Sequence, residues 1–431
     1  MISIIYMLLA TAMFFLQDTY FVVAGVELSL KNPCGLAILF LALINLIATV
    51  RLDRLFLLIR HTAVQALPFL IPLVFSAAIW VGTRAENVAV INGISMIFPQ
   101  LLSVLVAAAT LYLFGEKGIW YCLGAMCAAN FISVLVVIYT GGLGSFLQEF
   151  YTLIVTFSRE TGPLMTRLET HDLTFAFGPF LIYLLLHWKA SSYRWLWLLL
   201  VSFFFLVGLK RIAFPALALG VAAALLLRKL PSKASRQTAM CAAVAMMAVS
   251  FLYIAGIHNG LFEYLEAHGL DTKGRIRLFA NAAPYYEISF TYTGLGTGFE
   301  RMVEWMSGAV QTVPLRSQTQ IHNDFLRMYL NIGFFGYWVW LWSWLPARLG
   351  YWSRQGGKDG GCLFLGICVY CFVLYATDNT IYYPYTIVAC TLIPMACGFD
   401  VQAKDALARR CAQWSGGEER EAGQDRAGIE K

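Results

Sequence analysis

Residues 88–113 read VAVINGISMIFPQLLSVLVAAATLYL, a long apolar stretch that contains no charged side chain. A helix needs about 20 predominantly apolar residues to cross the hydrocarbon core of a bilayer. The stretch is long enough to do so, and it therefore predicts a membrane-spanning helix. The rest of the chain repeats this pattern on both sides of it.

Composition and hydropathy predict a polytopic membrane protein. Of the 431 residues, 59% are apolar and 13% are charged, and the mean hydropathy is +0.67. Soluble domains are about 45–50% apolar and about 25% charged, and an outer-membrane barrel would show short alternating segments. We therefore expect an all-α membrane protein, which excludes a cytosolic or secreted enzyme and a nucleic-acid-binding protein. About twelve spans are predicted, at 3–25, 34–50, 66–82, 88–113, 118–140, 172–188, 193–208, 211–228, 239–257, 325–347, 361–377 and 380–399.

These spans form one expected domain, residues 1–399. The tail at 400–431 is charged and rich in glycine, and we expect it to be disordered. The apolar stretch from Ile2 to Leu16 has no basic segment before it, so we interpret it as the first span rather than as a cleaved signal peptide.

The basic residues predict the orientation. With the N-terminus inside, thirteen Lys and Arg lie in short inner loops and six in short outer loops, which by the positive-inside rule places both termini in the cytoplasm. The inner set is Arg51, Arg54, Arg60, Lys117, Lys189, Arg194, Arg228, Lys229, Lys233, Arg236, Arg348, Arg354 and Lys358, and the outer set is Lys31, Arg84, Arg159, Arg167, Lys210 and Arg211. Two long loops, 141–171 and 258–324, then lie outside, the second between the ninth and tenth spans.

The ten cysteines do not indicate a metal site or a disulfide framework. Cys368 and Cys371 have CxxC spacing, but they lie inside an apolar run and no second pair accompanies them. We expect free thiols that act as small apolar side chains, with neither a metal nor a cofactor.

Three stretches on the expected outer face carry residues suited to chemistry. The first is GLKR at 208–211, between the seventh and eighth spans. The second is GRIRLF at 274–279, followed by GLGTGF at 294–299. The third is HNDFLR at 322–327, followed by GFFG at 333–336.

Cations in these stretches suit a phosphate group. Lys210 and Arg211 have almost no loop around them, so they either extend to lipid headgroups or face a site at the membrane boundary. Guanidinium groups match phosphate oxygens with two parallel bonds, which makes Arg211 and Arg275 candidate phosphate ligands. The alternative for Arg275 and Arg277 is an ordinary solvated surface charge. The run from Gly294 to Phe299, which includes Gly296, does not fit GxGxxG and indicates tight turns and close backbone approach.

His322 is the candidate for proton transfer. It lies at the outer end of the tenth span, and a neutral imidazole accepts a proton near neutral pH. Asn323 or Asp324 could orient its ring, and Asn323 and Arg327 are four residues apart and share a helix face. The alternative is an interfacial histidine without a catalytic role.

Together these stretches resemble the O-antigen ligase and O-antigen polymerase superfamily (WaaL and Wzy types) over roughly residues 200–400. The stretch HNDFLRMYLNIGFFG at 322–336 is similar to the family's His-Asn or His-Ser, Leu and Gly-x-x-Gly pattern at the start of a late helix. GRIRLF and GLGTGF resemble its Gly-Arg-x-x-x-Trp and Gly-x-Gly run, with Phe279 near the position of the Trp. LKRIAFPAL at 209–217 resembles its Ser-Arg stretch, with Lys210 in place of the Ser.

The resemblance implies a GT-C-like glycosyltransferase of the bacterial cytoplasmic (inner) membrane, whose donor is a glycan on undecaprenyl diphosphate. Carried over to this sequence, Arg211 and Arg275 would bind the diphosphate and His322 would act on the acceptor hydroxyl. Lys210, Arg277, Gly296, Asn323 and Arg327 are the expected substrate-binding residues. The implied partners are the donor and acceptor glycans, membrane lipids, a flippase and a chain-length regulator.

Several functions remain open at this point. A polymerase joins lipid-linked repeat units into surface polysaccharide, whereas a ligase transfers a finished glycan to another acceptor, and both use the same donor chemistry. We favour the polymerase. A flippase or transporter fits twelve helices, with Asp18 or the Asp378-Asn379-Thr380 segment along its pathway. A structural membrane subunit without catalysis is the fourth possibility.

Overall fold

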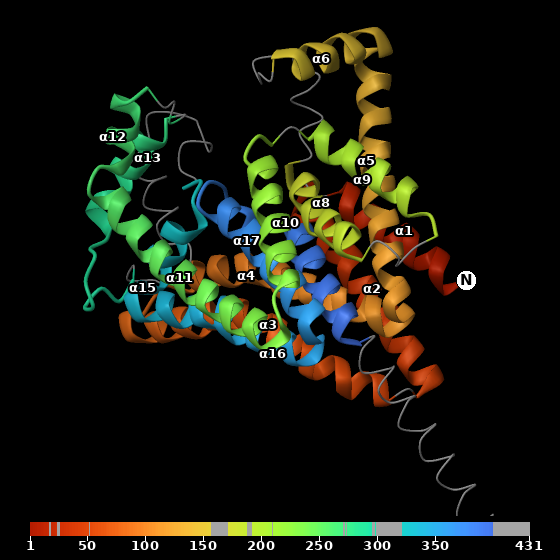
Figure 1. The fold of residues 1–431 in the computed structure, drawn as a ribbon, viewed down its shortest axis with the longest axis horizontal. Coiled ribbons are helices and arrows are strands. Elements are labelled where there is room, and N and C mark those ends of the chain that lie inside the picture. Colours follow the sequence, from red (N-terminus) through yellow and green to blue (C-terminus); the bar gives the residue numbers. More distant parts are fainter. Residues whose placement is uncertain are drawn as a thin grey trace, which may run out of the picture.

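The computed structural model describes residues 1–16, 19–23, 26–50, 52–156, 171–187, 192–208, 210–269, 272, 274–294, 298 and 321–399. These residues form a helical protein, as the sequence predicts, with one short hairpin near the N-terminus (Figure 1). The predicted tail at 400–431 and Gly296 lie outside the described residues.

The N-terminal region differs most from the prediction. Helix α1 covers Ile2–Phe15, and the two strands β1 (Tyr20–Val23) and β2 (Val26–Ser29) pair antiparallel before α2 (Lys31–Thr49). The predicted first span at 3–25 therefore ends ten residues early. An apolar run this short does not by itself distinguish a strand from a helix.

The next helices are α3 (Leu52–Thr83), α4 (Asn87–Phe114), the short η1 (Gly115–Lys117) and α5 (Gly118–Gly141). Helices α4 and α5 follow the predicted spans closely, whereas α3 begins before the span predicted at 66–82 and includes Arg54 and Arg60, which were predicted in an inner loop. The predicted outer loop at 141–171 contains a further helix, α6 (Leu143–Thr156), which lies across the end of α5 (Figure 1).

The second half alternates long helices with short ones. It comprises α8 (His171–Leu186), α9 (Arg194–Val207), α10 (Ala213–Lys229), α11 (Ser232–His258), α12 (Leu261–Ala267), α13 (Arg275–Ala282) and η2 (Ala283–Tyr285), then α15 (Asp324–Trp342), η4 (Ser343–Ala347), α16 (Arg348–Gln355), α17 (Gly357–Tyr375), η5 (Thr380–Tyr382) and a last helix, Pro384–Phe399. The predicted loop at 258–324 therefore contains α12 and α13.

Five helical runs among the described residues are long and apolar enough to cross a membrane. They are Lys31–Thr49, Arg54–Thr83, Ala89–Gly141, Ser232–His258 and Gly357–Tyr375, and the third of them includes both α4 and α5. Shorter apolar helices cover Ile2–Phe15, Leu173–Leu186, Arg194–Val207 and Pro384–Phe399. Length and composition thus support a membrane-embedded helical protein.

Helices α10 and α17 pack with their backbones in close approach. A Cβ atom on Gly220 would meet the carbonyl oxygen of Gly366 at 2.6 Å, and one on Gly366 would meet the carbonyl oxygen of Gly220 at 2.9 Å. Small residues allow this approach between helices in a bilayer. Gly220 lies two turns from the start of α10 and Gly366 lies two to three turns from the end of α17, so these two ends are neighbours.

Candidate functional site

Lys210 and Asp378 meet because of the α10–α17 contact. Lys210 lies three residues before the start of α10, and Asp378 lies in the turn that follows α17. The Nζ atom of Lys210 is 3.8 Å from Oδ2 of Asp378, and both side chains are almost buried. The same Nζ lies 5.6 Å from the centre of the Phe175 ring. The predicted outer-face lysine is therefore held inside the protein rather than extended to lipid headgroups.

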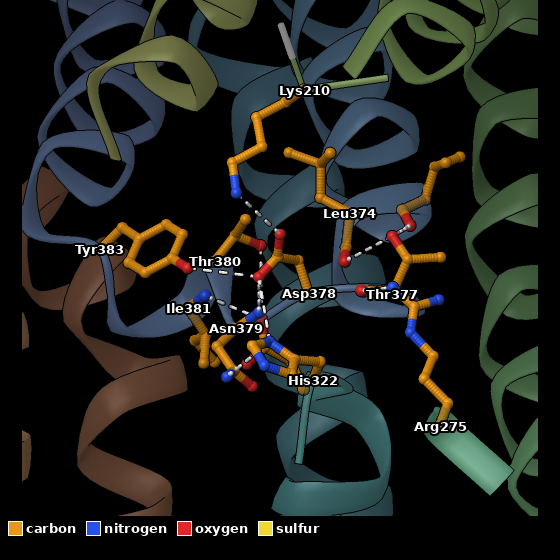
Figure 2. A network of polar contacts seen from close by, with 12 residues as sticks. Lys210, Arg275, His322, Leu374, Thr377, Asp378, Asn379, Thr380, Ile381 and Tyr383 are labelled. Carbon is orange, nitrogen blue, oxygen red and sulfur yellow. Dashed lines mark hydrogen bonds and ion pairs between the residues drawn. The ribbon is translucent and has the colours of Figure 1, made fainter. Parts of the chain in front are cut away.

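Asp378 is the centre of a polar network (Figure 2). Its Oδ1 accepts hydrogen bonds from the backbone N–H of Asn379 at 2.8 Å and from the Tyr383 hydroxyl at 3.2 Å. Burial alone would raise the pKa of this carboxyl group, but His322, Lys210 and the Asn379 N–H together hold the pKa well below its ordinary value. Asp378 is therefore a fixed negative charge.

His322 is the most accessible member of the network. Its Nδ1 is 3.7 Å from Oδ1 of Asp378, and its side chain is 41% exposed, compared with 13% for Asp378. The amide nitrogen of Asn379 lies 3.5 Å from the same Nδ1. Nδ1 either accepts from the Asn379 amide or donates to the Asp378 carboxylate, and the second tautomer leaves Nε2 of the neutral ring as the acceptor.

The start of α15 fixes the position of His322. The Oδ1 atom of Asn323 accepts the Leu326 N–H at 2.9 Å and so caps the helix, while its Nδ2 donates to the Ala376 carbonyl at 3.2 Å and to the Tyr253 hydroxyl at 3.3 Å. Asn323 is fully buried. Each of its side-chain polar atoms therefore contacts protein, and in this structure Asn323 positions the residue before it.

Asp324 ties the same helix to the turn after α17. Its Oδ2 accepts the Ile381 N–H at 2.8 Å and the Thr380 hydroxyl at 3.3 Å. Asp324 is completely buried, and within the described part of the chain its Oδ1 has no hydrogen-bond partner. This carboxylate therefore holds α15 against the segment that carries Asp378, rather than orienting His322 directly.

Arg275 reaches the turn from the opposite side. It is the first residue of α13, after Gly274 with φ 75°, and its Nη2 donates to the Thr377 carbonyl at 2.7 Å. Thr377 is the neighbour of Asp378, so Arg275 lies at the edge of the network shown in Figure 2. Lys210, Arg275 and His322, which lie 168, 102 and 56 residues before their partners in sequence, thus meet at the turn 376–383.

Of the other predicted site residues, Arg327 contacts this turn. The guanidinium of Arg327 stacks at 3.8 Å from the centre of the Tyr382 ring and is almost buried. Arg211 and Arg277 are exposed neighbours of Lys210 and Arg275 in sequence. Gly296 cannot be placed because it lies outside the described residues.

The two glycine stretches contact each other. Gly333 interrupts α15 with φ 71°, and the next N–H, that of Phe334, donates to the Tyr292 carbonyl at 3.0 Å. Gly294 has φ 101°, and a Cβ there would meet the Asn331 carbonyl oxygen at 2.8 Å. The close approach that the glycines predict is therefore chain against chain at these two positions.

Asp378 and Tyr383 are the residues of this site that the sequence did not assign to it. The segment Asp378-Asn379-Thr380 stood out only as a possible transport pathway. The available signal was a carboxylate between two apolar runs. It does not identify Lys210 as the partner, because that contact depends on how α10 packs against α17. The described ranges 210–211, 275–277, 322–327 and 376–383 contain five Lys and Arg and two Asp, an excess of positive charge that suits an anionic ligand.

Comparison with known proteins gives no family for this chain. No protein-family model matches it, and no curated protein matches its sequence.

Proposed function

We propose that this protein is a membrane glycosyltransferase that polymerises undecaprenyl-diphosphate-linked repeat units into surface polysaccharide. The observation that carries the proposal is the meeting of the three motif stretches at the turn 376–383. A histidine with a reachable ring, a buried carboxylate behind it and several cations suit transfer of a sugar from a diphosphate. The proposal includes about twelve spans, a GT-C-like architecture and cytoplasmic termini.

The proposed reaction uses His322 as the base. The acceptor hydroxyl oxygen attacks the anomeric carbon of the donor sugar, while the bond between that carbon and the diphosphate oxygen breaks. Nε2 of His322 takes the hydroxyl proton, and the carrier diphosphate leaves with the bonding electrons. Asp378 orients the ring and stabilises its charged form, as a carboxylate does for a catalytic histidine.

The cations stabilise the leaving group. Arg275 donates to the Thr377 carbonyl at this turn, Lys210 pairs with Asp378, and the exposed Arg211 follows Lys210 in the sequence. Donors that are already in place lower the barrier because they need little reorganisation as charge develops. A carrier with a long lipid chain also explains a site at the ends of apolar helices. Transport is less well supported. The binding site of a transporter is expected near the membrane midplane, whereas Asp378 lies in the turn that joins the end of α17 to the start of the helix Pro384–Phe399.

Purified protein incubated with lipid-linked repeat units tests the proposal. We expect a ladder of products on a gel, whereas a ligase would give one shifted acceptor and a transporter would give no product. His322→Ala should reduce chain extension by about 10²–10⁴-fold, the usual contribution of a positioned base. His268→Ala is the matched control, because His268 is an exposed histidine of the same outer segment. Normal ladders from His322→Ala would remove the catalytic assignment.

A further inference from the structure

A second cationic site lies at the other end of α17. A cavity of about 730 Å³ opens between the start of α11, the end of α16 and the start of α17. Helix α17 has 19 residues, which at 1.5 Å per residue separates this cavity from the Asp378 turn by roughly 28 Å. That is close to the thickness of the hydrocarbon core, about 30 Å. A membrane-spanning α17 would therefore place the cavity and the candidate site at opposite faces of the membrane.

The lining of this cavity suits a phosphate. Lys233, Arg236 and Lys358 supply three positive charges, and Ser232, Ser235 and Ser353 supply hydroxyl groups. None of the described lining residues is a carboxylate. Asp359 does not line the cavity, and its Oδ1 is paired with the Arg228 Nε at 3.3 Å. Helices α11 and α17 both begin here, so the positive ends of their dipoles add to the same field.

The surroundings favour a lipid over a soluble phosphate compound. Ala239 and Met240 form an apolar part of the lining. Beyond them α11 continues as an apolar helix, and Val244, one turn after Met240 on the same face, is 50% exposed. A headgroup in the cavity would thus have a hydrocarbon surface beside it for its acyl chains. Basic pockets between membrane helices bind anionic lipid headgroups in this way.

We propose that this cavity binds the phosphate headgroup of an anionic phospholipid, with its acyl chains along α11. The lipid belongs to the leaflet opposite the candidate site. This inference does not depend on the proposed glycosyltransferase activity, because it concerns a different end of the bundle and its test measures lipid binding alone.

Binding of phosphatidylglycerol to the purified full-length protein in detergent tests the proposal, with native mass spectrometry as the readout. We expect one retained phosphatidylglycerol and no comparable retention of phosphatidylcholine. Lys233→Gln combined with Arg236→Gln should weaken retention about 25-fold, since each cation near a membrane surface contributes about a fivefold factor. The matched control is Lys229→Gln combined with Arg354→Gln, an equal loss of charge from exposed residues outside the lining of the cavity.

The outcomes separate the possible sources of phosphate. Loss of retention in the cavity variant alone supports the proposal. An equal loss in the control variant would show general attraction to basic surface residues, and it would overturn the site. Displacement of the lipid by millimolar glycerol phosphate or inorganic phosphate would show that the cavity takes a soluble compound, and it would overturn the lipid assignment. Unchanged retention in the cavity variant would overturn both. The melting temperature of each variant checks that the fold is intact.

Discussion

At the scale of single residues, Asp378 connects the groups that the proposed chemistry needs. Its carboxylate contacts Lys210 on one side and His322 on the other, and the Tyr383 hydroxyl adds a third contact. Lys210 is almost buried, so removing the carboxylate would leave a cation without this counter-charge in a poorly solvated place. Asp378 therefore contributes both to stability and to the position of the imidazole.

Replacing Asp378 should lower stability at neutral pH. We expect Asp378→Asn to cost about 3 kcal/mol, the cost of removing one partner of a buried ion pair. The folded-state pKa of Asp378 is depressed. Its contribution is therefore complete above the ordinary pKa of about 3.9 and is lost as the pH falls towards the folded-state value. Melting temperatures in detergent between pH 3 and 7 measure this effect. Below about pH 4 the melting temperature of the variant should fall less steeply with pH than that of the wild type.

The control for this prediction is Asp359→Asn. That carboxylate is 57% exposed in its pair with Arg228, and exposed pairs contribute little to stability. Equal melting curves for wild type and Asp378→Asn would contradict the role assigned to Asp378.

At the scale of elements, the first half of α15, from Asp324 to Gly333, is fixed at its start and at its end. Asn323 caps it, and Gly333 breaks its helical geometry where the segment 292–294 inserts. Tyr292 adds a hydrogen bond from its hydroxyl to the Leu330 carbonyl at 2.9 Å. The position of His322 thus depends on a cap and on a glycine kink.

Gly333→Ala should therefore be costly. The residue has φ 71°, and a Cβ atom would lie 2.7 Å from the Gly294 nitrogen. We expect a loss of several kcal/mol, because backbone strain is added to a clash with backbone atoms that have no rotamer to change. Gly142→Ala is the control, with φ 85° and no atom within 4 Å of its Cβ, and it should cost about 2 kcal/mol from backbone strain alone. Similar melting temperatures for the two variants would contradict the clash.

The helices themselves were predictable where apolar runs are long and uninterrupted. The predictions at 34–50, 88–113, 118–140 and 172–188 agree with α2, α4, α5 and α8 to within about three residues. Helices α6, α12 and α13 were missed inside expected loops because, at 14, 7 and 8 residues, each is too short to be predicted as a membrane span. The hairpin β1–β2 was missed because its apolar residues continue those of α1.

The candidate site was predictable in part for a different reason. His322, Lys210 and Arg275 were found from the motifs in which they lie, and the structure brings them to one turn. Asp378 could not be connected with them from the sequence. Its contact with Lys210 depends on the close packing of Gly220 against Gly366, a contact between positions 146 residues apart that leaves no local pattern.

At the scale of the whole molecule, the two ends of the bundle should face different compartments. Tyr264 in α12 is 61% exposed, and α12 lies at the same end of the bundle as the candidate site. Lys229 is exposed at the opposite end of α10 from Lys210. In intact cells, we expect Tyr264→Cys to react with a membrane-impermeant maleimide and Lys229→Cys to react only after permeabilisation. Cys241 and Cys411 are first replaced by serine. Labelling of both positions from the same side would contradict the proposed orientation.

The contact between Gly220 and Gly366 has a mechanical consequence. With no side chain between the two backbones, α10 and α17 have no compressible layer and should move as one rigid unit. Lys210 and Asp378 then form a stationary wall, and we expect any widening needed to admit a bulky oligosaccharide to come from α13, whose Arg275 donates to the Thr377 carbonyl.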